Sequence, residues 1–250
     1  MSLFGYAGLL NTIEKCHRIL GGHGSGSAGS FPPASETAVA NAELRLGSQL
    51  PHSYREFLLT SNGCGKLHRT HGGLLPVEQI GWFRNLEPEW VRIWTQDNSR
   101  DVSEEEHLQK AQNPAYLRRA YLPELLQIGE SYDGSVYLLN PCVRTADGEW
   151  EAWDFANWYP GAKRFPSFRD LLDHVADSLN RTVYLETVEL NEDELMETAL
   201  VGTRARIEDG EDPQQAVMMY LSKAGRDDEL IFAWSFRSRP HQRILRALGY

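Results

Sequence analysis

The segment from Leu46 to Gly63 constrains the fold of this chain more than any other stretch of its sequence. Gly47 marks a hinge, and Pro51 suits the first turn of a helix, where its missing N–H costs nothing. Asn62 and Gly63 then favour the left-handed conformation that ends helices. Apolar residues recur between these points at helical spacing: Tyr54, Phe57 and Leu58. The segment therefore predicts a short amphipathic helix that buries one face.

The distribution of glycine, serine and acidic residues divides the chain into three parts. Residues 9–20 have a short helical pattern, and the Gly/Ser-rich stretch up to Ser30 has the composition of a flexible linker. Ser35 is a suitable N-cap for a helix that reaches Leu46 and pairs with the helix described above. We therefore expect an N-terminal helix and linker over 1–30, a main domain over 31–185, and an acidic, mostly helical C-terminal extension over 186–250.

Three apolar segments in the main domain have the pattern of an antiparallel meander. They span 125–129, 135–140 and 150–155, and Asp-Gly dipeptides separate them. Asp-Gly favours the positive φ angles of tight hairpin turns. Ser167 and Asp170 then form a capping pair at the start of a closing helix. These parts predict an α+β fold in which an antiparallel sheet packs against N-terminal and closing helices.

The helix segment also matches a family pattern, written lG..LP..yr.FL...NG. Further matches lie at 125–129, 132–137 and 152–155, and in the phenylalanine-led helix after Ser167. By these motifs the chain resembles the SMI1/KNR4 family of the SUKH superfamily, from about residue 36 to about residue 182. The resemblance implies the SUKH fold and a function in recognition, since members of the superfamily are mostly binding modules. The stretch 82–122 is longer than the family pattern usually allows.

Charge, cysteine content and hydropathy narrow the class of partner. The formal net charge is −10 at pH 7, and we expect no direct contact with nucleic acid, because phosphate binding needs a basic surface. A basic protein partner would be attracted, although acidity can equally serve solubility alone. Cys16, Cys64 and Cys142 lie far apart without CxxC spacing, which argues against disulfides and zinc. Because no apolar run could span a bilayer and the start lacks a secretory signal pattern, we predict a cytoplasmic protein without membrane contact.

Motifs that would indicate catalysis or a bound cofactor each have a simpler explanation. Residues 24–29 fit the dinucleotide pattern GxGxxG, but a helical pattern precedes them and two prolines follow, so they are interpreted as a linker. Cys64, His68 and His71 are close in sequence, but the two histidines would face opposite sides of a strand and a fourth zinc ligand is missing. The sequence contains no serine elbow and no SxxK lysine. We therefore predict no enzyme activity, no cofactor and no metal site.

Tryptophans are the strongest indication of a binding surface. Trp82, Trp90 and Trp94 occur in the stretch 82–122, which we expect to include one or two helices. Aromatic rings beside carboxylates can capture Arg or Lys side chains of a protein partner. The simpler alternative is that most of the tryptophans fill the core.

The strand at 150–155 carries two more tryptophans. Alternation places Trp150 and Asp154 on one face and Trp153 and Phe155 on the other. We expect Trp153 and Phe155 to be buried and Trp150 and Asp154 to lie nearer a surface or groove, while the reverse assignment stays open. Tyr132 precedes an Asp-Gly turn, so it is first a hairpin residue and only second a contact.

Together with the resemblance, these features predict a non-catalytic protein-binding module. The family suggests an immunity protein that binds and neutralises a cognate polymorphic toxin. A nuclease would suit an acidic antidote, because its own cleft must attract nucleic acid. The alternative, also suggested by the family, is an intracellular regulatory scaffold of the cell-wall synthesis or signalling type. The candidate partner-binding residues are Trp82, Trp90, Trp94, Tyr132, Trp150, Asp154, Glu192, Asp193 and Glu194.

Overall fold

The computed structural model describes residues 5–20, 29–68, 70–96, 101–111, 113–158, 161–227 and 229–250. The chain divides into two compact units, one ending at Leu179 and one beginning at Asn180. Two antiparallel sheets with flanking helices make the first unit an α+β structure, which confirms the predicted fold class. None of the helices in the described residues has both the length and the apolar character of a membrane span.

The first unit opens with three helices, α1 (Tyr6–Ile19), α2 (Glu36–Leu46) and α3 (His52–Thr60). Ser35 caps α2 by accepting a hydrogen bond from the backbone N–H of Ala38. Gly47 ends α2 with a φ of 67°, in the left-handed region. Helix α3 follows Pro51. The predicted pair of helices around Gly47 is therefore confirmed. The left-handed helix end predicted at Asn62 and Gly63 is wrong, because α3 ends at Thr60 with Ser61 as an extended C-cap, and Gly63 has its positive φ beyond that point.

An aromatic cluster joins α1, α3 and the closing helix α7 (Phe168–Thr187). The rings of Tyr54 and Phe57 lie 4.9 Å and 5.0 Å from that of Phe168, and the ring of Tyr6 lies 5.7 Å from that of Phe57. All four side chains are buried. Helix α1, which the sequence analysis grouped with the linker, thus contributes to the core of the first unit.

The strands form one small and one larger antiparallel sheet. The small sheet pairs β1 (Cys64–His68) with β2 (His71–Leu74). The larger sheet has the order β3-β4-β5-β6-β7, with β3 at Gly81–Trp82, β4 at Leu126–Gln127, β5 at Ser135–Arg144, β6 at Trp150–Ala156 and β7 at Ala162–Phe165. The predicted meander is β4-β5-β6, and Asp133 and Gly134 have the positive φ angles of its first turn. Strands β3 and β7, which the sequence analysis did not predict, extend the sheet at its two edges.

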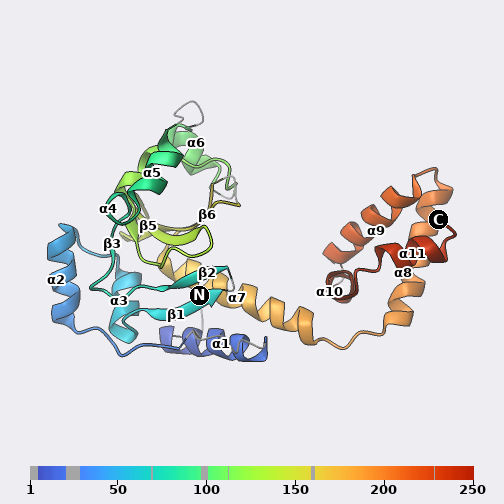
Figure 1. Cartoon of the computed structure of the whole chain (residues 1–250), viewed down its shortest axis with the longest axis horizontal. Helices are drawn as coiled ribbons and strands as arrows, with labels where there is room; N and C mark the ends of the chain where they lie inside the picture. The colour runs from blue at the N-terminus through green and yellow to red at the C-terminus, as the bar shows by residue number, and fades with distance from the viewer. Residues whose placement is uncertain are drawn as a thin grey trace. The chain divides into compact units, whose positions relative to one another are not determined.

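The stretch 82–122 folds into short helices: α4 (Phe83–Leu86), α5 (Pro88–Thr95), α6 (Glu104–Gln109) and the 3₁₀ helix η2 (Arg119–Glu124). Figure 1 shows α4, α5 and α6 on one side of β5 and β6, with α3, β1 and β2 on the other. Phe83 and Leu122 from the helical side pack with Trp153 and Phe155 of the sheet in one buried cluster. The predicted burial of Trp153 and Phe155 is confirmed.

Strand β6 is buried along its whole length, which corrects one expectation. Trp150 is 2% exposed and Asp154 is 7% exposed, so the prediction that they lie nearer a surface is wrong. The physical reason is that both faces of the sheet are covered. The helices of the 82–122 stretch pack on the face of Trp153, while His71 of the small sheet reaches Asp154 on the opposite face.

The second unit is helical and has a core of its own. Helix α7 runs across the boundary at Leu179, and α8 (Glu192–Glu208), α9 (Pro213–Asp227), α10 (Glu229–Ser238) and α11 (His241–Ala247) follow. Asn191 and Asp212 accept hydrogen bonds from the backbone at the starts of α8 and α9. The core cluster of this unit consists of Ala199, Val217, Trp234, Ile244 and Leu245. The mostly helical extension that the sequence predicted is confirmed.

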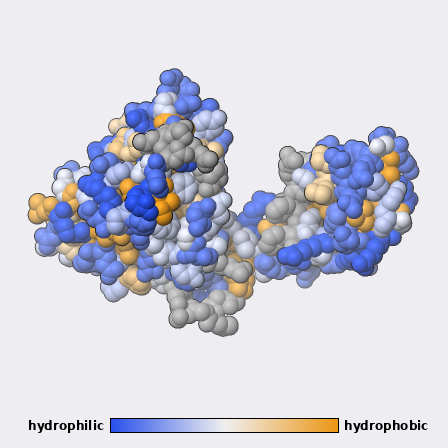
Figure 2. Space-filling view, turned by 45° about the horizontal axis from the view of Figure 1, so that its top comes forward, coloured by the Kyte–Doolittle hydropathy of each residue, from blue (hydrophilic) through white to orange (hydrophobic). Residues whose placement is uncertain are grey.

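The residues that each unit exposes to solvent are mostly hydrophilic. On the face drawn in Figure 2, hydrophilic residues cover most of each unit, and apolar residues form small separate patches. Scattered apolar patches are normal on a soluble surface. This face therefore has no large apolar patch that would mark a binding site, whereas the first unit contains hollows.

Candidate functional site

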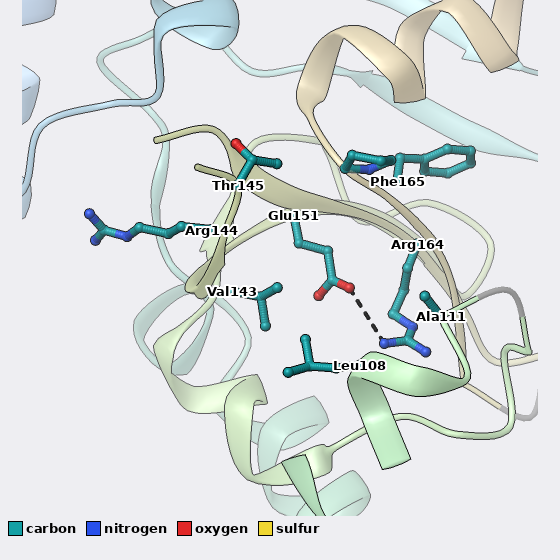
Figure 3. Close-up of a pocket in the computed structure, with 9 residues that line it drawn as sticks. Leu108, Ala111, Val143, Arg144, Thr145, Glu151, Arg164 and Phe165 are labelled. Carbon is teal, nitrogen blue, oxygen red and sulfur yellow. Dashed lines mark hydrogen bonds and ion pairs between the residues drawn. The ribbon is translucent and has the colours of Figure 1, made fainter. Parts of the chain in front are cut away.

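A hollow of about 210 Å³ lies beside the ends of β5, β6 and β7, next to α6. We call it the Glu151 pocket. Figure 3 shows its side chains, with the carboxylate of Glu151 and the guanidinium of Arg164 facing each other and Leu108 and Val143 close by. The full lining is Leu108, Ala111, Val143, Arg144, Thr145, Glu151, Arg164, Phe165 and Pro166. The pocket thus combines apolar walls with one buried pair of opposite charges.

Four donors surround the carboxylate of Glu151. Its Oε2 accepts hydrogen bonds from His107 Nε2 at 3.1 Å, Asn140 Nδ2 at 3.0 Å and Trp153 Nε1 at 2.6 Å. Its Oε1 accepts a longer one, at 3.4 Å, from Arg164 Nη1. A buried carboxylate needs such partners, because removal of a charge from water is costly.

Helix α6 enters this network through His107. The backbone N–H of Arg118 donates to His107 Nδ1 at 3.1 Å, so Nδ1 carries no proton and Nε2 is the atom that donates to Glu151. Arg164 donates to the backbone carbonyls of His107 and Lys110. The network therefore fixes the C-terminal end of α6 to β6 and β7, and with it one wall of the pocket.

Burial and hydrogen bonding act in opposite directions on the acidity of Glu151. Burial by itself raises the pKa of this carboxyl, but the hydrogen bonds from His107, Trp153 and Asn140 outweigh it, so the pKa of Glu151 lies below its ordinary value. Burial lowers the pKa of Arg164, against the opposing effect of Glu151. Glu151 is therefore held as a carboxylate, which suits a rigid recognition site better than proton transfer.

A second, smaller hollow of about 60 Å³ lies on the opposite face of the sheet. His71 Nε2 lies 2.6 Å from Asp154 Oδ1, and the ring of His71 stacks on Tyr137 at 4.7 Å. The hydroxyl of Thr70 hydrogen-bonds to Nδ1 of both His68 and His71. Burial is the main cause that lowers the pKa of His68, and the neighbouring His71 adds to it.

The position of these histidines corrects a second expectation. His68 and His71 do not face opposite sides of a strand, because they pair across the β1–β2 turn with ring centroids 5.9 Å apart. Burial raises the pKa of the third residue of this group, Cys64, to about 12. Among the described residues, no group of three or more His, Cys, Asp or Glu side chains is arranged to hold a metal ion.

The comparison with protein families agrees with this architecture. The model of the SMI1 / KNR4 family (SUKH-1) matches residues 33–174, which is more than half of the 250 residues. The chain belongs to the SMI1/KNR4 family. The SUKH-1 domain thus covers α2 to the first part of α7 and the whole lining of the Glu151 pocket, while two residues that line the smaller hollow, Val175 and Ser178, lie just beyond the match. No curated protein matches the chain.

The SUKH-1 domain uses its candidate aromatic residues mostly within itself. Trp90 and Trp94 pack against the buried cluster around Phe155, and Trp82 is half-buried at the edge of the sheet. Side chains of the same chain already lie over the aromatic rings. Arg84 lies over Trp82, Arg119 over Trp94, Arg144 over Trp150 and Lys66 over Tyr132, at 3.7 to 5.5 Å from the ring centroids.

These contacts within the chain limit which candidate residues a partner can bind. A cation of a partner would have to compete with the chain's own Arg and Lys side chains for the same rings. Trp150 and Asp154 are buried, so they support the SUKH-1 domain from inside rather than offer a contact surface. Tyr132, which is 40% exposed, keeps part of its ring accessible.

The acidic candidates lie at the first turn of α8, in the second unit and outside the family match. Glu192 accepts hydrogen bonds from Ser238 and Arg243, which ties the start of α8 to the last helices. Glu194 accepts from the N-cap residue Asn191. Asp193 is exposed. Of these three carboxylates, Glu192 is the one most clearly used for structure.

The sequence analysis missed the residues that build the Glu151 pocket. One signal was present, since Glu151 is a charged residue within the apolar strand Trp150–Ala156. Its partners could not be inferred in the same way, because His107 lies 44 residues away and Arg164 lies in a strand that the analysis did not predict.

Proposed function

We propose that this chain is a non-catalytic protein-binding module, an immunity protein that acts in the cytoplasm and neutralises a cognate toxin domain. The observation that carries the proposal is the match of residues 33–174 to the SMI1/KNR4 family, which is consistent with an immunity or related role. The geometry supports recognition rather than chemistry, because hydrogen bonds from His107, Asn140 and Trp153 hold the carboxylate in the Glu151 pocket in its charged form.

The charge of the chain supports a basic partner. A net charge of −10 produces a negative field that speeds the encounter with a positively charged surface. A toxin that acts on nucleic acid has such a surface, so an acidic antidote can cover it. Asp193 and Glu197 lie one helical turn apart on α8, are both exposed, and would contribute to this field.

Co-expression with the toxin domain encoded next to this gene tests the proposal. We expect the chain to restore growth of cells that produce the toxin, and to form a stoichiometric complex whose association rate falls as salt rises. Failure of rescue together with no complex would contradict the proposal. Capture of several weak partners, without rescue, would support a regulatory scaffold instead.

Charge reversal tests the electrostatic part separately. The double variant Asp193→Lys, Glu197→Lys should slow association with the toxin several-fold, with little change in dissociation rate. The matched control is Glu56→Lys, Asp177→Lys, which makes the same change in net charge at exposed positions of the first unit. Equal effects of the two double variants would show that α8 does not steer the encounter.

A further inference from the structure

The tip of the β1–β2 hairpin lies at the smaller hollow, on the face of the sheet opposite the Glu151 pocket. We define the tip as His68, Thr70 and His71, all of which line this hollow. Two polar contacts dock the tip on the larger sheet. Ser135 Oγ donates a hydrogen bond of 2.7 Å to the carbonyl of Thr70, and His71 Nε2 lies 2.6 Å from Asp154 Oδ1.

The docked tip covers buried side chains of the sheet. The ring of His71 stacks on Tyr137 with 4.7 Å between the centroids, and it meets Trp158 edge to face at 5.9 Å. Tyr137 and Asp154 are 2% and 7% exposed, whereas Trp158 is 45% exposed. Because His71 contacts both Tyr137 and Asp154, release of the tip would uncover an aromatic ring and a carboxylate.

A chain of hydrogen bonds runs from His68 to Asp154. The backbone N–H of Thr70 donates to His68 Nδ1 at 3.4 Å, so this nitrogen carries no proton. The hydroxyl of Thr70, 2.9 Å from the same nitrogen, donates to it as well. Thr70 Oγ1 then accepts from His71 Nδ1 at 3.1 Å, and His71 Nε2 donates to Asp154. The docked tip therefore uses the neutral form of His68, with Nδ1 as an acceptor.

The surroundings of His68 also favour its neutral form. Burial is the largest cause, and the described charged groups that act on His68 come from four other elements. His71 of β2, His17 of α1 and Lys163 of β7 disfavour a proton on it, and Asp154 of β6 favours one. The pKa of His68 is therefore lowered from the ordinary histidine value of about 6.5.

Helix α7 adds a further histidine to the lining of the hollow, His174. Burial and then Lys163 lower the pKa of His174, against the opposing effects of Asp154 and Asp177. His174 is exposed and packs on the ring of Phe165 at 4.9 Å, so water can hydrate its charge. Protonation of His68, in contrast, acts on the hydrogen bonds of the tip itself.

We propose that the tip of the β1–β2 hairpin is a pH-sensitive switch, which is docked on β5 and β6 while His68 is neutral and is released when His68 gains a proton. The added proton occupies Nδ1, so the N–H and the hydroxyl of Thr70 both lose their acceptor. The new positive charge also lies beside His71 and Lys163. The switch requires no partner, so it goes beyond the proposed function.

The direction of the pH dependence follows from the two states of the tip. In the released tip His68 has the ordinary pKa of about 6.5, and in the docked tip its pKa is lower. The released state therefore binds the proton more tightly. Docking is fully favoured above about pH 6.5 and weakens as the pH falls through the lower docked value.

An NMR titration of the full-length chain from about pH 8 to pH 5 tests the switch. The ring protons of His68 report its protonation, and the nuclear Overhauser contact between the rings of His71 and Tyr137 reports docking. We expect His68 to titrate below about pH 6.5 and the contact to be lost with the same midpoint. The indole N–H signal of Trp153 should stay unchanged, which shows that the rest of the first unit remains folded.

The variant His68→Asn removes the titrating group and keeps an acceptor for the N–H of Thr70, because its side-chain oxygen can take the place of Nδ1. Its tip should stay docked down to about pH 5. The matched control is His52→Asn, which removes an exposed histidine at the start of α3 and should leave the midpoint unchanged. Ser135→Ala is a second variant. It removes one docking contact, so release should occur at a higher pH than in the wild type.

Four results would overturn the proposal. His68 titrates at or above the ordinary value, or the contact between His71 and Tyr137 persists after His68 is protonated. A His68→Asn chain that is docked at about pH 8 still releases its tip with the wild-type midpoint. If His68→Asn is not docked at any pH, Ser135→Ala decides, and an unchanged midpoint in that variant excludes the switch.

Discussion

At the scale of single residues, the molecule depends on a few buried charges with long-range partners. Glu151 is surrounded by donors from α6, β5, β6 and β7, so one carboxylate connects four elements. Arg164 is 5% exposed and depends on this carboxylate for its counter-charge. Removal of one partner of a buried ion pair is strongly destabilising, because the other charge stays buried and unpaired. Removal of both partners together costs less.

Glu151→Gln should lower the free energy of unfolding of the first unit by about 3–5 kcal/mol, because Arg164 then stays buried without a counter-charge. The double variant Glu151→Gln, Arg164→Met should recover part of this loss. Urea unfolding, followed through NMR signals of β5 and β6, measures both. The exposed change Glu105→Gln is the control and should stay within about 0.5 kcal/mol. A loss of that small size in Glu151→Gln would mean that the network does not hold α6.

Because its pKa is lowered in the folded state, Glu151 makes the stability of the first unit depend on pH. Because hydrogen bonds hold the pKa of Glu151 below its ordinary value in the folded state, the unfolded state binds this proton more tightly. The stabilisation is fully present above the ordinary glutamate pKa of about 4.3 and is lost as the pH falls through the lower folded value. The difference in Tm between wild type and Glu151→Gln should therefore shrink below about pH 4.3. A difference that stays constant with pH would contradict this assignment.

At the scale of elements, local sequence signals explain where helices and turns end. Gly47 and Gly63 both have positive φ angles, 67° and 88°, and they lie before and after α3. Their surroundings differ. A Cβ at Gly47 would meet nothing within 4 Å, whereas one at Gly63 would lie 2.5 Å from the backbone oxygen of Leu74.

This pair of glycines allows a matched test. Gly47→Ala should cost about 1–2 kcal/mol, the penalty of the left-handed conformation alone. Gly63→Ala should cost about 1–3 kcal/mol more, because the new methyl group also pushes against the small sheet. Chemical denaturation of both variants measures the difference. Equal losses would show that the β1–β2 sheet moves freely to accommodate the methyl group.

At the scale of the whole molecule, the chain has two hydrophobic cores. One includes Trp153 and Phe155 in the SUKH-1 domain, and the other includes Trp234, Ile244 and Leu245 in the second unit. Each tryptophan is fully buried within its own cluster. Cores that do not share residues allow the two units to unfold at different free energies.

Trp234→Ala should therefore destabilise α8 to α11 by about 3–5 kcal/mol and leave the sheet unaffected. Trp153→Ala is the reciprocal variant and should have its main effect on β5 and β6. Amide hydrogen exchange reports each region separately. Loss of protection in both units of the Trp234→Ala chain would show that they unfold as one.

Predictions from the sequence were confirmed where the cause of a structural feature lies in residues close to it along the chain. Ser35 and Gly47 act within a few residues of themselves, and the two residues of the Asp133-Gly134 turn set its φ angles directly. The closing helix likewise begins with the predicted pair, Ser167 and Asp170. Caps, tight turns and helical spacing are local, so they could be derived before any contact between elements was known.

The sequence by itself determined the helices around Gly47, the meander β4-β5-β6, the α+β class and the family to which the chain belongs. Only the tertiary structure decided that neither side of β6 is free, because coverage of both faces depends on segments far along the chain. It also decided that Arg and Lys side chains of the chain lie over four candidate aromatic rings. The Glu151 pocket has the same origin, since the donors His107, Asn140 and Arg164 come from other elements, at positions that no local pattern connects to Glu151. Binding sites of this kind arise from long-range packing, and hydrogen bonds that join distant residues leave no periodic trace in the sequence.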